Sequence, residues 1–525
     1  MLVYGDRSEF GEPDERLAAV GERLAQIERM PAGIERHAQL VGALIESGRV
    51  QQGVEDGGAH SPALSAFVHR LAQAVVNSSD SRFEAVGELP PLPAVELPRT
   101  AEFREPEGFA FYAVYPEAYA AAARKLRLSG PPRVIGIRSI ATTLGAIVAA
   151  ALGAPPAITV RPFGDPFARR VELPDELIDE RSHYVIVDEG PGLSGSSFGA
   201  VADWLEQRGV PLERIAFVPS HGGDPGAEAS DAHRARWRRA QRSPAEFDCS
   251  FLSERFGPLE PLSNGAPWER RKFIGWYQGK RVLLKFAGLG TIGEGKLVMS
   301  RALHAAGVAP QPLGLAHGFL VERWCEHAQP LSSREAPVEE IGRYIGTRAK
   351  LFPAPEGSGA TVGELLVMSR RNAGLALGKN AARRLNCWES RVAELGKRVR
   401  RVRTDNKLDR EEWLRLAGGQ LFKTDAVDHH RGHDLIGCQD AAWDVAGAIA
   451  EFELDETQAR RLITASSLSI DAELLAFYRL AYAAFRVGQA TLSGETTPRP
   501  NRRARALDHL LHEDSCARDS AQMLG

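Results

Sequence analysis

The chain has 525 residues, of which 43% are apolar, and a formal net charge of -3 at pH 7. This length accommodates about two to four domains, and the composition is that of a folded protein and not of a disordered one. The small net charge gives no general reason to expect nucleic acid as a partner.

The sequence also argues against a secreted protein, a membrane-spanning protein and a protein held together by disulfides or a structural zinc. The opening MLVYGDRSEFGEPDER is charged from Asp6 onward, which is not typical of a signal peptide. The most apolar window, LGAIVAAALGA, is too short to cross a bilayer, so no membrane partner is expected. Five scattered cysteines without a C-x-x-C pair favour a reducing cytoplasm over a disulfide frame or a structural zinc.

Residues 1–105 are predicted to form a helical N-terminal region. Apolar residues recur at helical spacing over 16–29, 33–50 and 63–78, and proline then recurs over 87–108 too often for a helix or a central strand. We interpret the helices as a cap or a homo-oligomerisation element, and the proline-rich stretch as a linker or an edge that wraps onto the next domain.

Residues 106–255 are predicted to form an α/β domain with a parallel sheet. Four short apolar segments, at 133–137, 158–164, 184–190 and 214–220, alternate with helical patterns. Ligands of such sheets bind outside the carboxyl ends of the strands. The ends of three strands, Arg138-Ser139, Arg161 and Asp188-Glu189, are therefore expected around one site.

The stretch from Tyr184 to Phe198 is the main functional signal of this domain. A buried strand ends in Asp188 and Glu189, and a Gly/Ser loop leads into a helix, so backbone N–H groups and a helix dipole converge on one point. The loop spells G-x-G-x-x-G, but a strand-helix unit precedes it and the next strand ends without an acid, so a dinucleotide fold is disfavoured. No lysine follows, which excludes a P-loop. An ordinary α/β turn with solvated acids remains an alternative.

Beside the dinucleotide fold and the P-loop, a third interpretation of this loop gives both Asp188 and Glu189 a function. The strand and acids at 185–189, followed by Ser194-Gly195-Ser196-Ser197, resemble the motif with which type I phosphoribosyltransferases bind 5-phosphoribosyl 1-pyrophosphate (PRPP). The resemblance implies that Asp188 and Glu189 are catalytic and hold the ribose, and that pyrophosphate leaves C1 with Mg²⁺ assistance as a nitrogen heterocycle attacks. The PRPP-binding residues that it implies are Arg138, Ser139, Arg161, Gly192, Ser194, Gly195, Ser196 and Ser197.

Residues 262–490 carry a second set of motifs. Two strands joined by a glycine-containing turn place Lys285 in VLLKF, a helix follows with Glu294, and the chain continues through Glu322-Arg323-Trp324. Asp405, Asp425 in LFKTDAVD, and Asp440 and Asp444 in QDAAWDVAGAIAEF come later. The acids and histidines at 425, 428, 429, 433 and 434 fit no established zinc spacing.

This order resembles the small-molecule, aminoglycoside phosphotransferase-like branch of the protein-kinase-like fold. The resemblance implies ATP as a ligand, with Lys285 on its phosphates, Glu294 as the helix partner of Lys285, Asp405 as the catalytic aspartate and Asp425 as a metal ligand. Three features depart from the pattern: no His-Gly-Asp precedes Asp405, no Asn lies five residues after it, and no G-x-G-x-x-G covers the nucleotide.

The sequence therefore predicts a phosphoribosyltransferase-like domain, a bilobal α+β kinase-like domain that phosphorylates a related metabolite, and a flexible tail at 491–525. The alternative is a non-catalytic PRPP or nucleotide sensor with a degenerate kinase-like domain, in stress or conflict signalling. A third hypothesis, a nucleic-acid binder, depends on the basic runs at 233–242 and 391–403 and is disfavoured.

Overall fold

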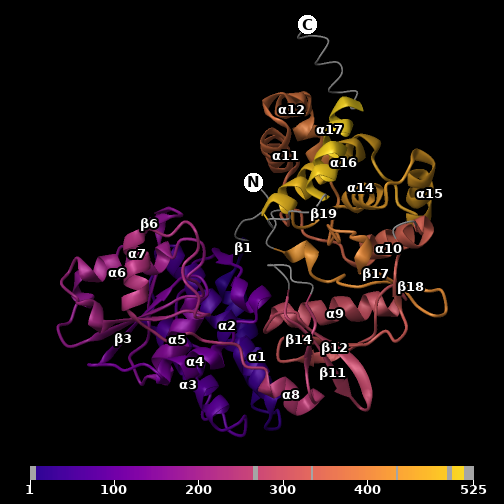
Figure 1. Ribbon diagram of the computed structural model, residues 1–525. Helices are drawn as coiled ribbons and strands as arrows, with labels where there is room; N and C mark the ends of the chain where they lie inside the picture. Colours follow the sequence, from indigo (N-terminus) through magenta and orange to yellow (C-terminus); the bar gives the residue numbers. More distant parts are fainter. Residues whose placement is uncertain (1–7, 264–269, 333–334, 433–435, 493–498, 514–525) are drawn as a thin grey trace.

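The computed structural model describes residues 8–263, 270–332, 335–432, 436–492 and 499–513 (Figure 1). Among these residues, no helix combines the length and apolarity that crossing a membrane requires. The four described cysteines, Cys249, Cys325, Cys387 and Cys438, are all free.

The three predicted N-terminal helices are confirmed as α1 (Pro13–Ile27), α2 (Ile34–Asp56) and α3 (Pro62–Asp80). Ser61 caps α3 by accepting a hydrogen bond from the Leu64 N–H at 3.2 Å. The proline-rich stretch has no regular structure until β2 (Ala101–Arg104), which pairs antiparallel with β1 (Ser8–Gly11). One π-helical turn, η1 (Gly108–Tyr112), and helix α4 (Pro116–Arg124) then lead into the α/β part.

The predicted parallel sheet is confirmed, with the order β4-β3-β7-β8-β9. Its strands are β3 (Pro132–Ile137), β4 (Ile158–Val160), β7 (His183–Val187), β8 (Ile215–Val218) and β9 (Gln241–Arg242). Side chains alternate between the two faces: Val185 and Val187 pack with α3, α4 and α5 (Ala141–Ala151), whereas Tyr184 and Ile186 pack with α6 (Ser196–Glu206) and α7 (Asp231–Arg239). The hairpin of β5 (Phe163–Asp165) and β6 (Ala168–Arg170) stands apart from this sheet.

A second sheet is antiparallel, with the order β10-β11-β12-β14-β13. Helix α8 (Ser250–Phe256) leads into it, and its strands are β10 (Glu260–Pro261), β11 (Lys272–Tyr277), β12 (Lys280–Phe286), β13 (Pro312–Ala316) and β14 (Phe319–Arg323), with α9 (Thr291–Ala305) between β12 and β13. Gln278 and Gly279 close the predicted β11–β12 hairpin, with φ angles of 51° and 74°. Such positive φ angles match the twist of two-residue hairpins.

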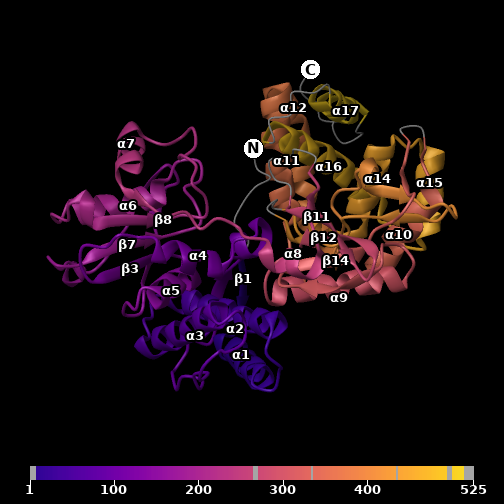
Figure 2. The same cartoon turned by 60° about the horizontal axis from the view of Figure 1, so that its bottom comes forward.

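The rest of the chain is mainly helical and packs beside this sheet (Figure 2). Its helices are α10 (Val338–Leu351), α11 (Val362–Leu377), α12 (Lys379–Arg384), α13 (Val392–Arg398), α14 (Ala441–Phe452), α15 (Glu456–Ser466), α16 (Ala472–Leu492) and α17 (Arg499–Glu513). Short strands form two small sheets: β15 (Gln329–Pro330) with β17 (Trp413–Arg415) and β18 (Leu421–Lys423), and β16 (Arg401–Val402) with β19 (Gln439–Asp440). Single 3₁₀ turns are η2 (Asp175–Leu177), η3 (Leu212–Arg214), η4 (Leu385–Arg391), η5 (Arg410–Glu412) and η6 (His429–Arg431).

The prediction of a flexible tail over 491–525 is wrong for α17. Leu507 and Leu511 are buried in the same apolar cluster as Phe477 and Tyr478 of α16. Only part of one face of α17 is apolar, so its sequence alone does not identify a docked helix.

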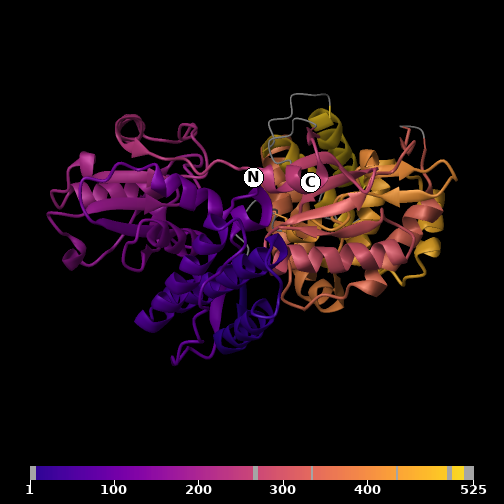
Figure 3. The same cartoon turned by 90° about the horizontal axis from the view of Figure 1, so that it is seen from below.

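One hydrophobic core crosses the predicted boundary between the two halves. The cluster that contains α1–α3, α5 and one face of the parallel sheet continues into β12 and β14 of the antiparallel sheet. Tyr115 contacts Phe286 at 6.1 Å between ring centroids, and its hydroxyl donates to the His317 carbonyl at 2.6 Å. The N-terminal helices therefore lie against both halves (Figure 3).

Candidate functional site

The parallel sheet has one topological switch point, between β3 and β7. From β3 the chain continues to β4 on one side, and from β7 it continues to β8 on the other. The loops therefore diverge and leave a crevice at the carboxyl ends, where ligands of such sheets bind. Arg138-Ser139 follows β3 and Asp188-Glu189 follows β7, so two of the predicted strand ends are neighbours.

The two acids lie at the end of β7 without an ion-pair partner in the part of the chain that the structure describes. Glu189 Oε2 accepts a hydrogen bond from the Gly108 N–H at 2.9 Å, and Asp188 Oδ1 accepts one from the Glu189 N–H at 2.8 Å. Burial raises the pKa of Asp188 to about 7. Burial, Glu107 and Asp188 raise the pKa of Glu189 to about 8. Carboxylates perturbed in this way are typical of sites that bind a ligand or a cation.

The predicted phosphate loop lies beside these acids and leads into α6. Gly195 has a φ of 62°, and a Cβ there would lie 2.4 Å from His233 Nε2, so the position requires glycine. The Ser194 and Ser196 hydroxyls donate to the Pro166 carbonyl at 3.4 and 2.7 Å, which places the tip of the β5–β6 hairpin over the loop. Gly192 is exposed and Ser197, in the first turn of α6, is half-buried.

The two arginines of this site have partners that the sequence did not indicate. Arg138 pairs with Glu55 at 2.8 Å and with Asp56 at 3.1 Å, both at the end of α2. Arg161 pairs with Asp56 at 2.5 Å and donates to the Arg138 carbonyl at 2.8 Å. The expectation that both guanidinium groups face a bound anion is therefore corrected: α2 neutralises them, and Arg161 stays near the loop through Ser139 Oγ at 3.5 Å.

In the second half, the predicted phosphate-binding Lys285 and the predicted metal ligand Asp425 lie in direct contact. Lys285 Nζ contacts both Asp425 and Asp428. Asp428 also pairs with Lys296 at 2.7 Å and with Arg270 at 3.4 Å. Burial alone would raise the pKa of Asp428, but the surrounding cations hold it well below its usual range. The acid at 428 belongs to the cluster at 425–434 noted in the sequence, of which His433 and Asp434 lie outside the described residues.

The prediction that Glu294 is the helix partner of Lys285 is wrong in this structure. Glu294 accepts two hydrogen bonds from Arg23, both at 2.8 Å, and one from Gln39 at 2.9 Å. The N-terminal helices thus bind one face of α9, and Lys296 of the same helix pairs with Asp428 instead. The sequence offered no signal for a partner 271 residues away.

Asp405, the predicted catalytic aspartate, is completely buried. The Tyr344 hydroxyl contacts one of its oxygens, and His429 Nδ1 and Lys423 Nζ lie at 2.9 and 3.3 Å. The backbone N–H groups of Asp405 and Asn406 donate to Asp444 at 2.8 and 3.0 Å, which fixes the loop. Asp405 therefore has no open side from which a substrate hydroxyl could approach.

The space near Lys285 and Lys423 is also small. The cavity that these residues line, with Glu322 and Asp425, has a volume of about 10 Å³, which is room for about one water. Asp425, which the sequence predicts to be a metal ligand, forms an ion pair with Lys285. The ligand atoms of Asp405, Glu412 and His429 lie within 4.8 Å of one another and could hold a cation, but Lys423 already pairs with Glu412 at 2.6 Å.

The basic runs are neutralised in part. In α7, Trp237 is buried and cannot stack on a base, and Arg236 pairs with Asp203 and Glu206. Arg391 pairs with Glu473, and Arg398 with Asp471, at 3.0 and 3.3 Å. These contacts weaken the nucleic-acid hypothesis further.

Comparisons with known proteins find similarity only among solved structures. No family model matches the sequence, and no curated protein matches it. About half of this chain, 50%, matches 97% of choline kinase LicA from Streptococcus pneumoniae, at 16% identity and a TM-score of 0.39. A choline/ethanolamine kinase family protein from Mesorhizobium loti matches at 17% identity and a TM-score of 0.35, over 50% of this chain and 91% of its own.

The macrolide 2'-phosphotransferase MphH from Brachybacterium faecium matches at 15% identity and a TM-score of 0.33, over 49% of this chain and 96% of its own. Likenesses of this size assign no activity to the chain, and none of these proteins corresponds to a phosphoribosyltransferase. Half of the chain matches structures of small-molecule kinases and phosphotransferases.

Proposed function

We propose that the α/β half binds PRPP with Mg²⁺ and transfers its phosphoribosyl group to a nitrogen heterocycle. One observation carries this proposal: Asp188 and Glu189 stand unpaired at the switch point, beside the start of α6. Neither carboxylate forms an ion pair among the described residues; a magnesium ion would supply a counter-charge, and the hydroxyls of a bound sugar would donate hydrogen bonds to them.

Each part of the crevice has a role in this reaction. Asp188 and Glu189 accept hydrogen bonds from the ribose hydroxyls, while the backbone N–H groups of residues 194, 195 and 197 bind the 5-phosphate. The Ser196 N–H already donates to Ser194 Oγ at 3.2 Å. Ser139 lies where pyrophosphate would leave, and Arg161, which Asp56 neutralises, orients it from 3.5 Å. The bond from C1 to the pyrophosphate oxygen breaks and a bond from C1 to nitrogen forms, and Mg²⁺ would stabilise the departing charge.

We infer a different role for the kinase-like half, as a sensor or scaffold that does not transfer phosphate. The observation that favours this second candidate is charge balance: Lys285 is satisfied by Asp425 and Asp428, and Asp405 by Lys423 and His429. The small size of the cavity beside Lys285, about 10 Å³, supports the same candidate.

Pyrophosphate release from PRPP tests the transferase. Mg²⁺ and a panel of purine and pyrimidine bases are supplied to the full chain, and we expect base-dependent release that falls by about 100-fold in Asp188→Asn and Glu189→Gln, because a misplaced ribose loses the reactive geometry. The matched control is Asp175→Asn, since the Asp175 side chain is 76% exposed and pairs only with Arg208 among the described residues.

The same protein distinguishes the candidates. PRPP that raises the melting temperature without any pyrophosphate release would show that the α/β half binds PRPP but does not transfer it, and PRPP that neither binds nor reacts removes the proposal for the α/β half. ATP with Mg²⁺ is expected to leave the melting temperature unchanged. ATP-dependent phosphorylation of any small molecule would contradict the closed state of the kinase-like half.

A further inference from the structure

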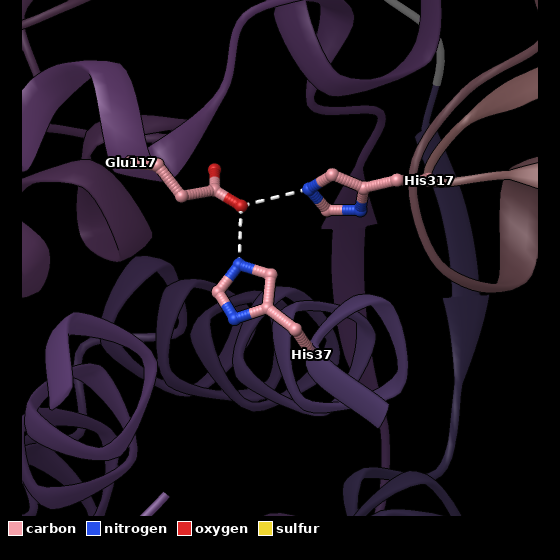
Figure 4. A group of neighbouring side chains, drawn as sticks. All are labelled: His37, Glu117 and His317. Carbon is pink, nitrogen blue, oxygen red and sulfur yellow. Dashed lines mark hydrogen bonds and ion pairs between the residues drawn. The ribbon is translucent and has the colours of Figure 1, made fainter. Parts of the chain in front are cut away.

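Three side chains from distant segments meet in the interior, away from both sites described above (Figure 4). His37 comes from α2, Glu117 from α4, and His317 from the turn between β13 and β14. Both rings turn Nε2 toward the same oxygen, Glu117 Oε1, at 2.5 Å from His37 and 2.7 Å from His317. One potential ligand atom from each residue lies within 4.8 Å of the others.

The group is built around one partly buried carboxylate, that of Glu117, whose side chain is 18% exposed. In the part of the chain that the structure describes, the ion-pair partners of Glu117 are the two imidazoles alone. Imidazoles are commonly neutral at physiological pH, and an uncompensated buried carboxylate is costly. The second oxygen, Glu117 Oε2, is buried and accepts no hydrogen bond.

The surroundings fix the orientation of both rings. His37 Nδ1 lies 2.9 Å from Ser78 Oγ, so its outer nitrogen has a partner as metal-bound histidines usually do. If that nitrogen donates to Ser78, the Nε2 lone pair faces a carboxylate oxygen, an arrangement that a cation between them would stabilise. Tyr115 holds the His317 carbonyl at 2.6 Å.

The backbone at His317 fixes the direction of its side chain. His317 and Gly318 close the β13–β14 hairpin with φ angles of 40° and 91°. Glycine favours such positive φ angles, and histidine is among the few other residue types that are enriched there. The turn points the His317 ring at Glu117 (Figure 4).

We propose that His37, Glu117 and His317 form a binding site for a divalent transition metal of the zinc class. Two imidazole nitrogens and one carboxylate oxygen suit Zn²⁺, with Zn–N distances of about 2.0–2.1 Å, and Glu117 Oε2 or a water completes the coordination. The metal would fasten α2 and α4 to the antiparallel sheet. The site stands independently of the proposed transferase activity.

Metal content of the full chain tests this site. The protein is purified without chelator, equilibrated with Zn²⁺, freed of excess ion and measured by inductively coupled plasma mass spectrometry. We expect about one zinc per chain, and a loss to background in Glu117→Gln and His317→Gln. His69→Gln is the matched control, because His69 is also buried on a neighbouring helix, and its one side-chain hydrogen bond within the described residues is to Gln73.

Two further variants keep the test decisive. His317→Cys should retain the metal, and with Co²⁺ it should add a thiolate charge-transfer band that the native protein lacks. Glu412→Gln should leave the zinc content unchanged, since it removes a ligand of the other cluster near Asp405. Native protein that binds no zinc or cobalt would overturn the proposal and leave a hydrogen-bonded triad. Zinc that persists in both Glu117→Gln and His317→Gln would overturn it as well.

Discussion

Single side chains differ most clearly in how their charges are balanced. Glu189 at the end of β7 receives a hydrogen bond from Gly108 but no cation, whereas Lys285 in the second half contacts two carboxylates. A charged group that its own chain satisfies gains little from a ligand, and a desolvated, unpaired group gains more. This difference makes the α/β crevice the better candidate for a working site.

The unpaired state of Glu189 predicts a pH dependence of stability. Its pKa is raised to about 8 by burial, Glu107 and Asp188, against about 4.3 in an unfolded chain. Between these values the folded state keeps a proton that the unfolded state has released, so its contribution to stability is lost as the pH rises through this window. Relative to the native protein, the free energy of unfolding of Glu189→Gln should therefore rise by about 4 kcal/mol between pH 5 and pH 9, because about three pKa units of this window lie above pH 5 and each is worth about 1.36 kcal/mol.

Urea denaturation at both pH values measures this difference. Asp175→Asn is the control, because an exposed acid should give the same difference from the native protein at pH 5 and pH 9. Equal effects of Glu189→Gln at the two pH values would show that Glu189 is solvated, and the charge argument for the site would fail.

At the scale of elements, the turn η1 connects the two halves. The Gly108 N–H donates to Glu189 at 2.9 Å, and the Phe109 carbonyl accepts from the Leu289 N–H at 2.9 Å, just before α9. Arg270 donates to the Ala110 carbonyl at 3.1 Å. A displacement of η1 would therefore move Glu189 together with the start of α9.

Gly108→Ala tests this connection. A Cβ at position 108 would lie 2.7 Å from Ile140 Cδ1 and 2.9 Å from Glu189 Cδ, so the segment must shift. We expect a loss of about 1–3 kcal/mol in the free energy of unfolding, as for other overpacked sites, and weaker PRPP binding in calorimetry.

The matched variant is Gly295→Ala in α9, where a Cβ would meet nothing within 4 Å. Alanine in an open helical position should stabilise the protein by about 0.5–1 kcal/mol and leave the affinity for PRPP unchanged. Native stability and affinity in Gly108→Ala would contradict the close packing of η1 on Glu189.

For the whole molecule, the shared core predicts cooperative unfolding. Phe319 of β14 belongs to the apolar cluster that also contains α5 of the α/β half. Phe319→Ala should cost about 3–5 kcal/mol and should speed amide exchange in α5 as well as in β12, because one cluster supports both elements. Hydrogen exchange with mass spectrometry resolves the two segments.

Phe477→Ala provides the comparison, since Phe477 lies in the separate cluster of α11, α14 and α16. That variant should speed exchange mainly in the helical part and spare α5. If Phe319→Ala left exchange in α5 at the native rate, the two halves would be independent domains, as the sequence at first suggested.

The sequence determined the features that depend on neighbours along the chain. Period-two and period-3.6 patterns located the N-terminal helices, the parallel strands and the β11–β12 hairpin, since side-chain spacing directly reports which face is buried. Strand ends placed Asp188-Glu189 beside Arg138-Ser139, because carboxyl ends of parallel strands meet at one edge.

Only the tertiary structure decided which charges cancel. The pairing of Arg138 with Glu55, of Glu294 with Arg23, and the burial of Asp405 all depend on segments that are far apart in sequence. So does the meeting of Glu117 with His37 and His317, across 80 and 200 residues. Periodicity is a local property, whereas an ion pair forms only where folding brings two distant segments within a few ångströms, and desolvation there decides whether a charge is satisfied or left for a ligand.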